Sequence, residues 1–595
     1  MSQYNVTQYS VNSILTWVKD GDIAVPEIQR PFVWSTIQVR DLIDSLYKGY
    51  PIGYIVTWKN PDVRLKDGSK SSGKKVLIDG QQRITAMSAA ILGMLVINKE
   101  YAEARIYIAF HPLKEEFATL TPAIEKDSSW IPDIFAIISK ESGLFKDVEN
   151  YCSANKGADK ELVEKNIEKL REIKNSDIGY IELNSHLDID TVTDIFIRVN
   201  SSGTVLSQAD FVMSKIASYG NFGVNLRKLI DYFCHLAREP QFYEKISQND
   251  VEFSNTPYLN KISWLQNENN DLYIPSYTDV IRVSFTKEFE RGKLGDLVSL
   301  LSGRNFETRT FEQIIQEKTF KRLENSLLES VNETNFKRFV MIIKSAGFIS
   351  SDLITSQNAL NFAYILYLKL RDKKYEPGAI EELVKKWFVM SLLTSRYSGS
   401  PETVMDNDIR GIASNGAEKE LKIIEDSELS IAFWENGLVN ELEKSSSSNP
   451  FINVFFATQI KEGDEGFLSK DITVASLIQH RGDIHHIFPK DFLKTKYSQR
   501  SEYNQIANFC YAQSEINIRV GNKSPKIYFG EIKKQCQGGK LKYGNIDNTR
   551  ALKRNLQKHC IPENIFNMDI ENYFDFLEER RRLMAKKIEN YYKSL

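Results

Sequence analysis

Two adjacent histidines near the C-terminus, His485 and His486, stand in the segment Asp483-Ile-His-His-Ile-Phe-Pro. Side chains alternate along a strand, so a strand here points one histidine toward a metal ion and its neighbour toward a phosphate. Histidine has an unperturbed pKa near neutrality, which suits a general base that activates water, and a cation would neutralise the charge that builds on the phosphate. The segment therefore indicates metal-dependent phosphodiester hydrolysis, whereas the alternative is a structural histidine pair.

Two asparagines, Asn508 and Asn517, follow this segment, and the basic residues Arg519 and Lys523 beyond them are candidates for contact with DNA. A site of histidine, asparagine and water with few carboxylates suits Mg²⁺ or Mn²⁺, held partly by the substrate's own phosphate. The cysteines are scattered and form no CxxC pair: Cys152, Cys234, Cys510, Cys536 and Cys560. They indicate reduced thiols rather than a zinc-thiolate site.

A second polar group, Asp79-Gly-Gln-Gln-Arg83, follows an apolar run in the N-terminal part. If Gly80 makes a tight turn, a helix begins at Gln81 or Gln82 and directs backbone N–H groups at one spot, which suits an anion. The Arg83 guanidinium suits phosphate oxygens, a glutamine can position an attacking water, and Asp79 can hold Mg²⁺ or polarise that water. The alternative is a capped turn braced by salt bridges.

Two further segments place polar residues next to apolar ones. Gln29 and Arg30 begin the run Gln-Arg-Pro-Phe-Val-Trp34, and Arg198 lies in the run Phe-Ile-Arg-Val-Asn200. We expect Gln29, Arg30 and Arg198 to close the pocket formed by the Asp-Gly-Gln-Gln-Arg turn. Trp34 could stack on a nucleotide base.

Residues 460–595 resemble the HNH (ββα-metal) nucleases, in the form in which asparagine replaces the last histidine. The resemblance implies that His485 is the first metal ligand and Asn517 the second, and that His486 is the general base. It implies that Asn508 is the central asparagine, which braces the loop and keeps the base oriented. Asp483 would orient a histidine or contact the metal through water.

Residues 8–215 resemble the N-terminal domain of the GmrS/GmrD family of modification-dependent (type IV) restriction endonucleases, which is related to the ParB/sulfiredoxin fold. The polar N-terminal segments occur in the family's order, and an HNH domain is the family's usual companion. The resemblance implies binding and hydrolysis of a nucleoside triphosphate, GTP or ATP, coupled to DNA cleavage. It makes Asp79, Gln82 and Arg83 catalytic and assigns nucleotide binding to Gln29, Arg30, Trp34, Gly80, Gln81, Arg198 and Asn200.

The elements that would position these residues follow from hydrophobic periodicity and turn signals. We predict helices over 35–47 (with Ser35 as N-cap), 81–94, 189–199, 208–218, 358–371, 379–394 and 571–592, and strands over 52–58, 76–78 and 105–110. Ser-Ser-Ser-Ser at 445–448 indicates a linker. The chain is thus expected to be an α+β multidomain protein: a ParB-like domain (1–218), a helical middle domain with linker (219–449) and an HNH domain (450–595).

Charge is distributed unevenly between the two ends of the chain. Residues 481–595 hold 22 Lys and Arg against 13 Asp and Glu, a net +9, so residues 1–480 carry −11 of the total −2. A basic C-terminal fifth suits a domain that meets phosphate backbones. The alternative is an ordinary solvated basic face.

No run of about 18 apolar residues occurs and the first residues lack the features of a secretion signal, so we expect a cytoplasmic protein. The expected function is NTP-dependent cleavage of modified double-stranded phage DNA in antiviral defence, with no membrane partner. A homodimer would let a one-site enzyme cut both strands. The alternatives are a nickase that depends on phosphorothioate-modified host DNA, and a ParB-type DNA-binding regulator.

Overall fold

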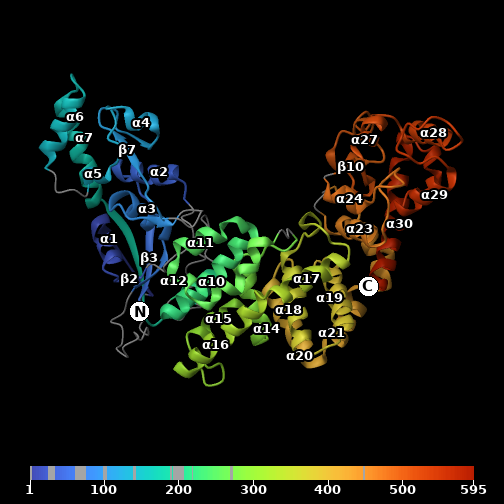
Figure 1. Cartoon of the computed structure of the whole chain (residues 1–595), viewed down its shortest axis with the longest axis horizontal. Coiled ribbons are helices and arrows are strands. Elements are labelled where there is room, and N and C mark those ends of the chain that lie inside the picture. The colour runs from blue at the N-terminus through green and yellow to red at the C-terminus, as the bar shows by residue number, and fades with distance from the viewer. Residues whose placement is uncertain are drawn as a thin grey trace. The chain divides into compact units, whose positions relative to one another are not determined.

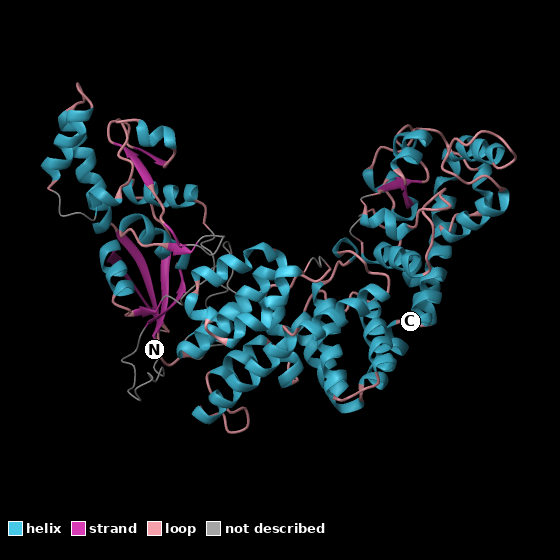
Figure 2. Cartoon of the chain, viewed as in Figure 1, coloured by secondary structure: helices cyan, strands magenta, loops and turns pink. Residues whose placement is uncertain are grey.

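The computed structural model describes residues 3–24, 34–59, 75–97, 103–138, 143–187, 191, 207–217, 219–268, 272–445, 449–480 and 482–595. The chain folds into two compact units, residues 1–267 with 295–319 and residues 268–294 with 320–595. It is an α+β, multidomain protein, mostly helical with small sheets. The described strands lie in the N-terminal part of the first unit and in a short pair at β10 in the second (Figures 1 and 2).

The first unit is built on a five-stranded sheet with strand order β1-β9-β3-β4-β2. β1 (Tyr4–Ser10) is antiparallel to β9 (Asp177–Leu183), which runs parallel to β3 (Tyr54–Lys59). β4 (Lys75–Asp79) is antiparallel to β3 and parallel to the short edge strand β2 (Ile23–Ala24). Parallel strands end at the same edge, so β2 ends at the edge where β4 turns into the next helix.

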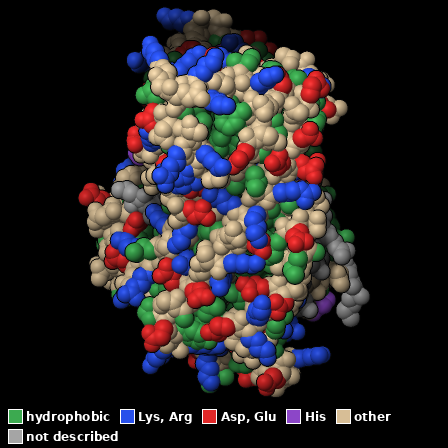
Figure 3. Space-filling view, turned by 90° about the vertical axis from the view of Figure 1, so that its right-hand side faces the viewer, with side chains coloured by type: hydrophobic (Ala, Val, Ile, Leu, Met, Phe, Trp, Pro, Cys, Tyr) green, Lys and Arg blue, Asp and Glu red, His purple; other side chains and the backbone are tan. Residues whose placement is uncertain are grey.

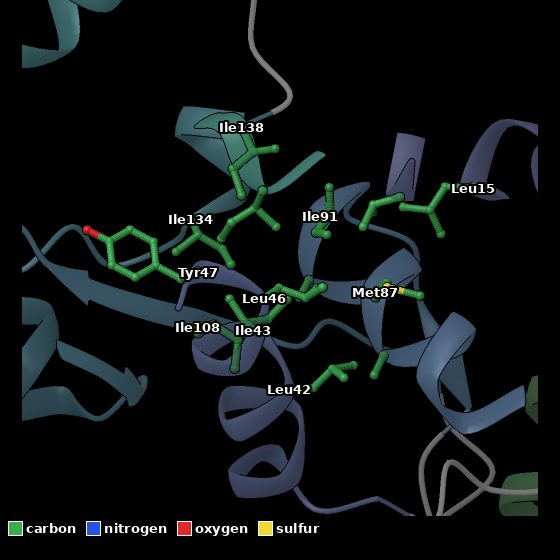
Figure 4. Packing of buried hydrophobic residues seen from close by; sticks show 14 of the residues in the cluster. Leu15, Leu42, Ile43, Leu46, Tyr47, Met87, Ile91, Ile108, Ile134 and Ile138 are labelled. Carbon is green, nitrogen blue, oxygen red and sulfur yellow. The ribbon is translucent and has the colours of Figure 1, made fainter. Parts of the chain in front are cut away.

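Helices α2 (Thr36–Tyr47) and α3 (Gln81–Ile91) bury their apolar faces in the core of this unit. Figure 4 shows Leu42 and Leu46 of α2 in one apolar cluster with Met87 of α3. Because α2 and α3 share this core, the residues just before Gln81 are held on a rigid frame.

The other described helices and strands of the first unit are, in chain order, α1 (Val11–Lys19), β5 (Val96–Ile97), β6 (Glu103–Ala104), β7 (Ile108–His111), β8 (Glu116–Thr119), α4 (Pro122–Lys126), α5 (Phe135–Ile138), α6 (Leu144–Ala154), α7 (Lys160–Glu172), η1 (Ile173–Asn175), α9 (Gln208–Ala217), α10 (Gly220–Arg238), η2 (Pro240–Phe242), α11 (Tyr243–Asn249), α12 (Val251–Ser254), α13 (Pro257–Ile262) and η3 (Ser263–Asn267). Two helices contain a boundary between the units, α15 (Leu294–Leu301) and α16 (Gln313–Ser330).

Helices α18 (Gln357–Asp372) and α19 (Pro377–Leu393) form the centre of the second unit. Most of their residues are buried, as is expected for helices that are apolar nearly all round. α14 (Tyr277–Phe289) packs against α18, and α23 (Pro450–Lys461) packs against α19.

The C-terminal helix α30 (Tyr573–Ser594) joins the C-terminal segment to these helices. α30 packs against α23, and the Tyr591 hydroxyl donates to the carbonyl of Ala346 at 2.5 Å. The Lys587 ammonium donates to the Asp464 carboxylate at 2.6 Å. Chain segments on both sides of residue 449 therefore lie in one compact unit.

The other described helices and strands of the second unit are α17 (Glu333–Ser345), η4 (Ser351–Leu353), α20 (Pro401–Asn415), α21 (Ala417–Glu428), the π-helix η5 (Phe433–Gly437), α22 (Leu438–Glu441), α24 (Val474–Gln479), β10 (Asp483–His486), α25 (Lys490–Leu493), α26 (Arg500–Tyr503), η6 (Ile506–Asn508), β11 (Phe509–Ala512), α27 (Ser514–Val520), α28 (Pro525–Gln535), α29 (Thr549–Lys558), η7 (Glu563–Asn567) and η8 (Ile570–Asn572).

The secondary structure predicted for long periodic segments is confirmed. α2 begins after Ser35, whose side chain accepts from the backbone N–H of Gln38 in a capping box. The strands predicted over 52–58 and 76–78, the helices over 208–218, 358–371, 379–394 and 571–592, and the mostly helical stretch 220–440 are present, with ends shifted by at most a few residues.

Two predicted boundaries were wrong. The helix predicted over 81–94 ends at Ile91, because Gly93 takes a positive φ of 73° that a helix cannot continue through. The strand predicted over 105–110 begins only at Ile108. The helix predicted over 189–199 lies, apart from Thr191, outside the described residues, and the domain boundaries after 218 and 449 stay predictions. Within the described parts of the chain, no helix is long and apolar enough to cross a membrane.

Candidate functional site

The strand pair β10–β11 and the helix α27 that follows it carry the C-terminal candidate residues. β10 pairs antiparallel with β11, with His485 opposite Cys510 and His486 opposite Phe509. Strand alternation puts Asp483 and His485 on one face of β10 and His486 on the other. α27 packs against β10 and presents Asn517 to it. The two histidines thus have separate surroundings, although they are adjacent in sequence.

His486 is half-buried between an amide and an aromatic ring. Its Nε2 lies 3.1 Å from Oδ1 of Asn504, and the Phe509 ring meets the imidazole edge-on with the centroids 4.9 Å apart. Burial lowers the pKa of His486, and the positive charge of Lys490 adds to this, whereas the hydrogen bond to Asn504 raises it. A lowered pKa keeps the ring neutral near pH 7, the form that can accept a proton.

His485 is almost fully buried, with 2% of its surface exposed, and stacks on Phe467 at 5.6 Å between centroids. Its Nδ1 lies 2.7 Å from Oδ1 of Asn517, while Nε2 has no hydrogen-bond partner among the described residues. Burial lowers the pKa of His485 to about 4, so the ring is neutral and one nitrogen keeps a lone pair. A neutral, buried imidazole is the form in which histidine binds metal ions.

The His485–Asn517 pair fits one side of a divalent ion. Octahedral Mg²⁺ binds its ligands at about 2.0–2.1 Å, so neighbouring ligands lie about 2.9 Å apart, close to the 2.7 Å between Nδ1 and Oδ1. The amide oxygen can only accept, so Nδ1 donates to it in this structure, and to hold an ion through Nδ1 the neutral ring would carry its proton on Nε2 instead. No cluster of three or more His, Cys, Asp and Glu able to hold a metal occurs in the described part of the chain. Burial also raises the pKa of Cys510 to about 12, which keeps that thiol protonated. The donor set therefore suits an oxygen-preferring ion with water and phosphate as further ligands.

Asn508 is fully buried and its side chain braces the turn that follows β10. Its Oδ1 accepts from the backbone N–H of Phe488 at 2.8 Å, and its Nδ2 donates to the carbonyl of the same residue at 2.9 Å. The neighbouring Ile487 carbonyl accepts from the Tyr528 hydroxyl at 2.7 Å. Each polar group of this turn that would otherwise be buried without a partner is satisfied, which fixes the backbone next to His486.

The two predicted DNA contacts, Lys523 and Arg519, are bonded within the protein. The Lys523 ammonium lies 3.3 Å from the Glu531 carboxylate and 2.5 Å from the Tyr543 hydroxyl. Arg519 is exposed and donates to the carbonyl of Lys542 at 2.7 Å. Because Lys523 is neutralised by a carboxylate, a phosphate would have to compete with Glu531 for it.

In the first unit, β4 leads through Gly80 into α3 as the sequence predicts. Gly80 has φ 96°, and a Cβ there would lie 2.4 Å from the Ile55 side chain, so the turn requires glycine. No side chain caps α3, whose first N–H groups therefore face the turn. The Gln82 side-chain oxygen is buried with no hydrogen-bond partner among the described residues.

Arg83 is bonded to the protein itself. Its guanidinium donates to Oδ2 of Asp79 at 2.7 Å and to the carbonyl of Ile52 at 2.8 Å. Gly53 gives room for this, because a Cβ there would lie 2.2 Å from the guanidinium. A salt bridge, as expected if the turn is only a structural feature, is thus present between Arg83 and Asp79. Arg83 also joins the β4–α3 turn to the segment before β3.

The other predicted nucleotide-binding residues are only partly described. Trp34 is half-buried and packs against the core of the first unit, and Gln81 is half-buried at the start of α3. Gln29, Arg30, Arg198 and Asn200 lie outside the described residues.

Asn504, the residue bonded to His486, was not predicted from the sequence. It lies at the end of the short helix α26, and nothing in its sequence context points to the histidine 18 positions earlier. Two exposed lysines were also not predicted, Lys490 at the start of α25 and Lys494 just after its end. Their position shortly after Pro489 was the available signal.

The N-terminal part of the chain is similar to a known protein family. Residues 11–217 match the family described as GmrSD restriction endonuclease, N-terminal domain. A protein of Methanocaldococcus jannaschii, itself uncharacterized, is 22% identical over 628 aligned positions that cover 98% of this chain and 98% of that protein. The N-terminal part of the chain is thus similar to the N-terminal domain of the GmrSD restriction endonucleases.

Proposed function

We propose that the chain is a metal-dependent DNA endonuclease of antiviral defence, in which β10, β11 and α27 form an HNH site. The observation that carries the proposal is the buried side chain of Asn508, which pairs with both backbone groups of Phe488 and so fixes the turn beside His486. A structural histidine pair would not need a dedicated brace next to a neutral, half-exposed ring.

In the proposed reaction His486 takes a proton from water as the water oxygen attacks phosphorus. The bond from phosphorus to the leaving oxygen breaks, and this oxygen departs with the electron pair and takes a proton from solvent. His485 and Asn517 would hold Mg²⁺ or Mn²⁺, and Asp483 lies on the same strand face as His485. When bound, such an ion neutralises charge on the phosphate and on the leaving oxygen.

A basic surface next to His486 supports DNA as the substrate. Lys490 and Lys494 are exposed, and their ammonium groups lie 6.0 and 5.8 Å from the centre of the Tyr503 ring. Lys490 is close enough to His486 to lower its pKa. Cations around an aromatic ring suit a nucleic-acid backbone and its bases. On the face drawn in Figure 3, Lys and Arg are interspersed with Asp and Glu. The support for DNA binding therefore comes from Lys490 and Lys494 rather than from the net charge of a whole face.

We propose that the β4–α3 turn of the first unit is a nucleotide site. α3 begins without a side-chain cap, and the side-chain oxygen of Gln82 has no hydrogen-bond partner among the described residues. These groups suit a phosphate and an attacking water. In this proposal Arg83 acts with Asp79 as one charged pair, and nucleotide hydrolysis controls DNA cleavage.

The decisive experiment incubates the full chain with plasmid DNA and phage DNAs that are unmodified, hydroxymethylated, glucosylated or phosphorothioated. Each DNA is tested with and without Mg²⁺ and with GTP, ATP or neither. We expect Mg²⁺-dependent cleavage that is strongest on modified phage DNA in the presence of nucleotide. Cleavage restricted to phosphorothioated DNA and limited to nicks would favour the self-sensing nickase, and DNA binding without cleavage would contradict the nuclease and favour a regulator.

A further inference from the structure

The side-chain amide of Asn504 links His486 to the chain segment that precedes α23. Its Nδ2 donates to the carbonyl of Ser445 at 2.9 Å, and its Oδ1 lies 3.1 Å from Nε2 of His486. A second hydrogen bond joins the same two segments, since the backbone N–H of Ile506 donates to the carbonyl of Lys444 at 2.9 Å. Asn504 is therefore held from one side and contacts the imidazole from the other.

These contacts determine which nitrogen of His486 carries the proton. A carbonyl oxygen can only accept, so Asn504 must turn its NH₂ group toward Ser445 and its oxygen toward the ring. The amide oxygen can also only accept, so the neutral ring must donate from Nε2. Nδ1 is left with a lone pair.

We propose that Asn504 is a positioning residue for His486: it keeps the ring proton on Nε2 and directs Nδ1 toward the water that attacks phosphorus. The inference rests on the proposed nuclease function. The Phe509 ring limits the imidazole on another side but offers no acceptor. Asn504 supplies the one hydrogen bond described for this ring, and the carbonyl of Ser445 holds the amide that makes it.

The proposal predicts a specific kinetic signature for Asn504→Leu. Leucine has a similar size but offers no acceptor, so the ring can rotate and Nδ1 is misplaced in part of the molecules. A misplacement of about 1 Å can cost about 100-fold in rate. We expect kcat for plasmid cleavage to fall about 10- to 100-fold, while KM for DNA and the Mg²⁺ concentration required stay unchanged.

Asn504→Asp separates the two contacts. Aspartate keeps an acceptor for Nε2 but loses the donor to Ser445, so it should recover kcat to about 10-fold above that of the leucine variant. Gln505→Leu is the matched control on the same loop, because its side chain donates to Ser501 and not to His486. Its kcat should stay near that of the wild type.

The assay compares these variants with wild type and His486→Ala at equal folded fraction, checked by thermal melting. Unchanged kcat in Asn504→Leu, or equal losses in the leucine and aspartate variants, would overturn the positioning role. If His486→Ala cleaved as fast as wild type, the assignment of the site to His486 would fail, and absence of cleavage by the wild type would contradict the nuclease function itself. Loss of cleavage in His486→Ala with full activity in Asn504→Leu would reject the positioning role alone.

Discussion

The β10–β11 site and the β4–α3 turn both place polar side chains at the end of a short strand. The two regions differ in the hydrogen bonds that these side chains make with the rest of the protein. At β10, Asn504 and Asn508 make the supporting hydrogen bonds, and one ring nitrogen of His486 stays outside them. At β4, the candidate residue Arg83 makes the supporting hydrogen bonds itself, to Asp79 and to the carbonyl of Ile52.

This difference predicts that a substitution at β10 separates activity from stability, whereas one at β4 affects both. The His486 ring does not brace the backbone, so it can be removed without unfolding the site at β10. A guanidinium that braces a turn cannot be removed without loosening that turn.

His486→Ala should reduce DNA cleavage by about 10²–10⁴-fold, the usual contribution of a general base. Stability and nucleotide turnover should stay near wild type, because the ring is only half-buried. The measurements are initial rates on plasmid DNA and thermal melting. The control is His480→Ala, an exposed histidine bonded only to the carbonyl of Ser476. Cleavage at one tenth of the wild-type rate would rule out His486 as the base.

Arg83→Ala should lower nucleotide turnover by about 10- to 100-fold, since a hydrogen bond to a charged group contributes about 1.5–3 kcal/mol. It should also lower the melting temperature by several degrees, because the carbonyl of Ile52 and the carboxylate of Asp79 lose their donor. Turnover must be measured well below the melting temperature. Arg83→Lys keeps the charge but not the two-armed contact. Normal turnover in a destabilised Arg83→Ala would make the turn purely structural.

Asn517→Ala should raise the Mg²⁺ or Mn²⁺ concentration required for half-maximal cleavage by about 10-fold or more, with little change at saturating metal. EDTA should abolish the activity of both proteins. The measurement is a metal titration of cleavage rate for variant and wild type. An unchanged titration, or inhibition by a zinc-specific chelator alone, would exclude the His485–Asn517 pair as the ion site.

Lys494→Ala should raise KM for DNA a few-fold and reduce the slope of log affinity against log salt by about 1, because one exposed phosphate contact is lost. Lys523→Ala should have a smaller effect, because the Lys523 ammonium is bonded both to Glu531 and to the Tyr543 hydroxyl, whereas the Lys494 side chain is more exposed. Lys494 is itself 2.9 Å from Asp491, so its effect should be modest. Binding measured at several salt concentrations distinguishes the two lysines. A larger effect at Lys523 would place the DNA on the α27–α28 side.

Much of the local structure could be predicted because it depends on neighbours in sequence. The capping box at Ser35 and Gln38 and the strand-to-helix turn at Gly80 need only residues a few positions apart. The periodicity of α18 and α19 is equally visible, since burial on nearly all sides requires apolar residues throughout. His485, His486, Asn508 and Asn517 could be proposed as site residues because their spacing resembles that of a known nuclease family.

The partners of those residues depend on chain segments that meet only after folding. Asn504 reaches His486 because α26 returns beside β10, and Ser445 reaches Asn504 from 59 positions away. The sequence determined which residue types are present and, apart from some ends, where the long periodic helices and strands lie. Only the tertiary structure decided which cations are already neutralised, as at Lys523 and Arg83, and which ring nitrogen of His486 is left for chemistry. The physical reason is that hydrogen bonds and ion pairs act over about 3 Å in space, whatever the separation along the chain.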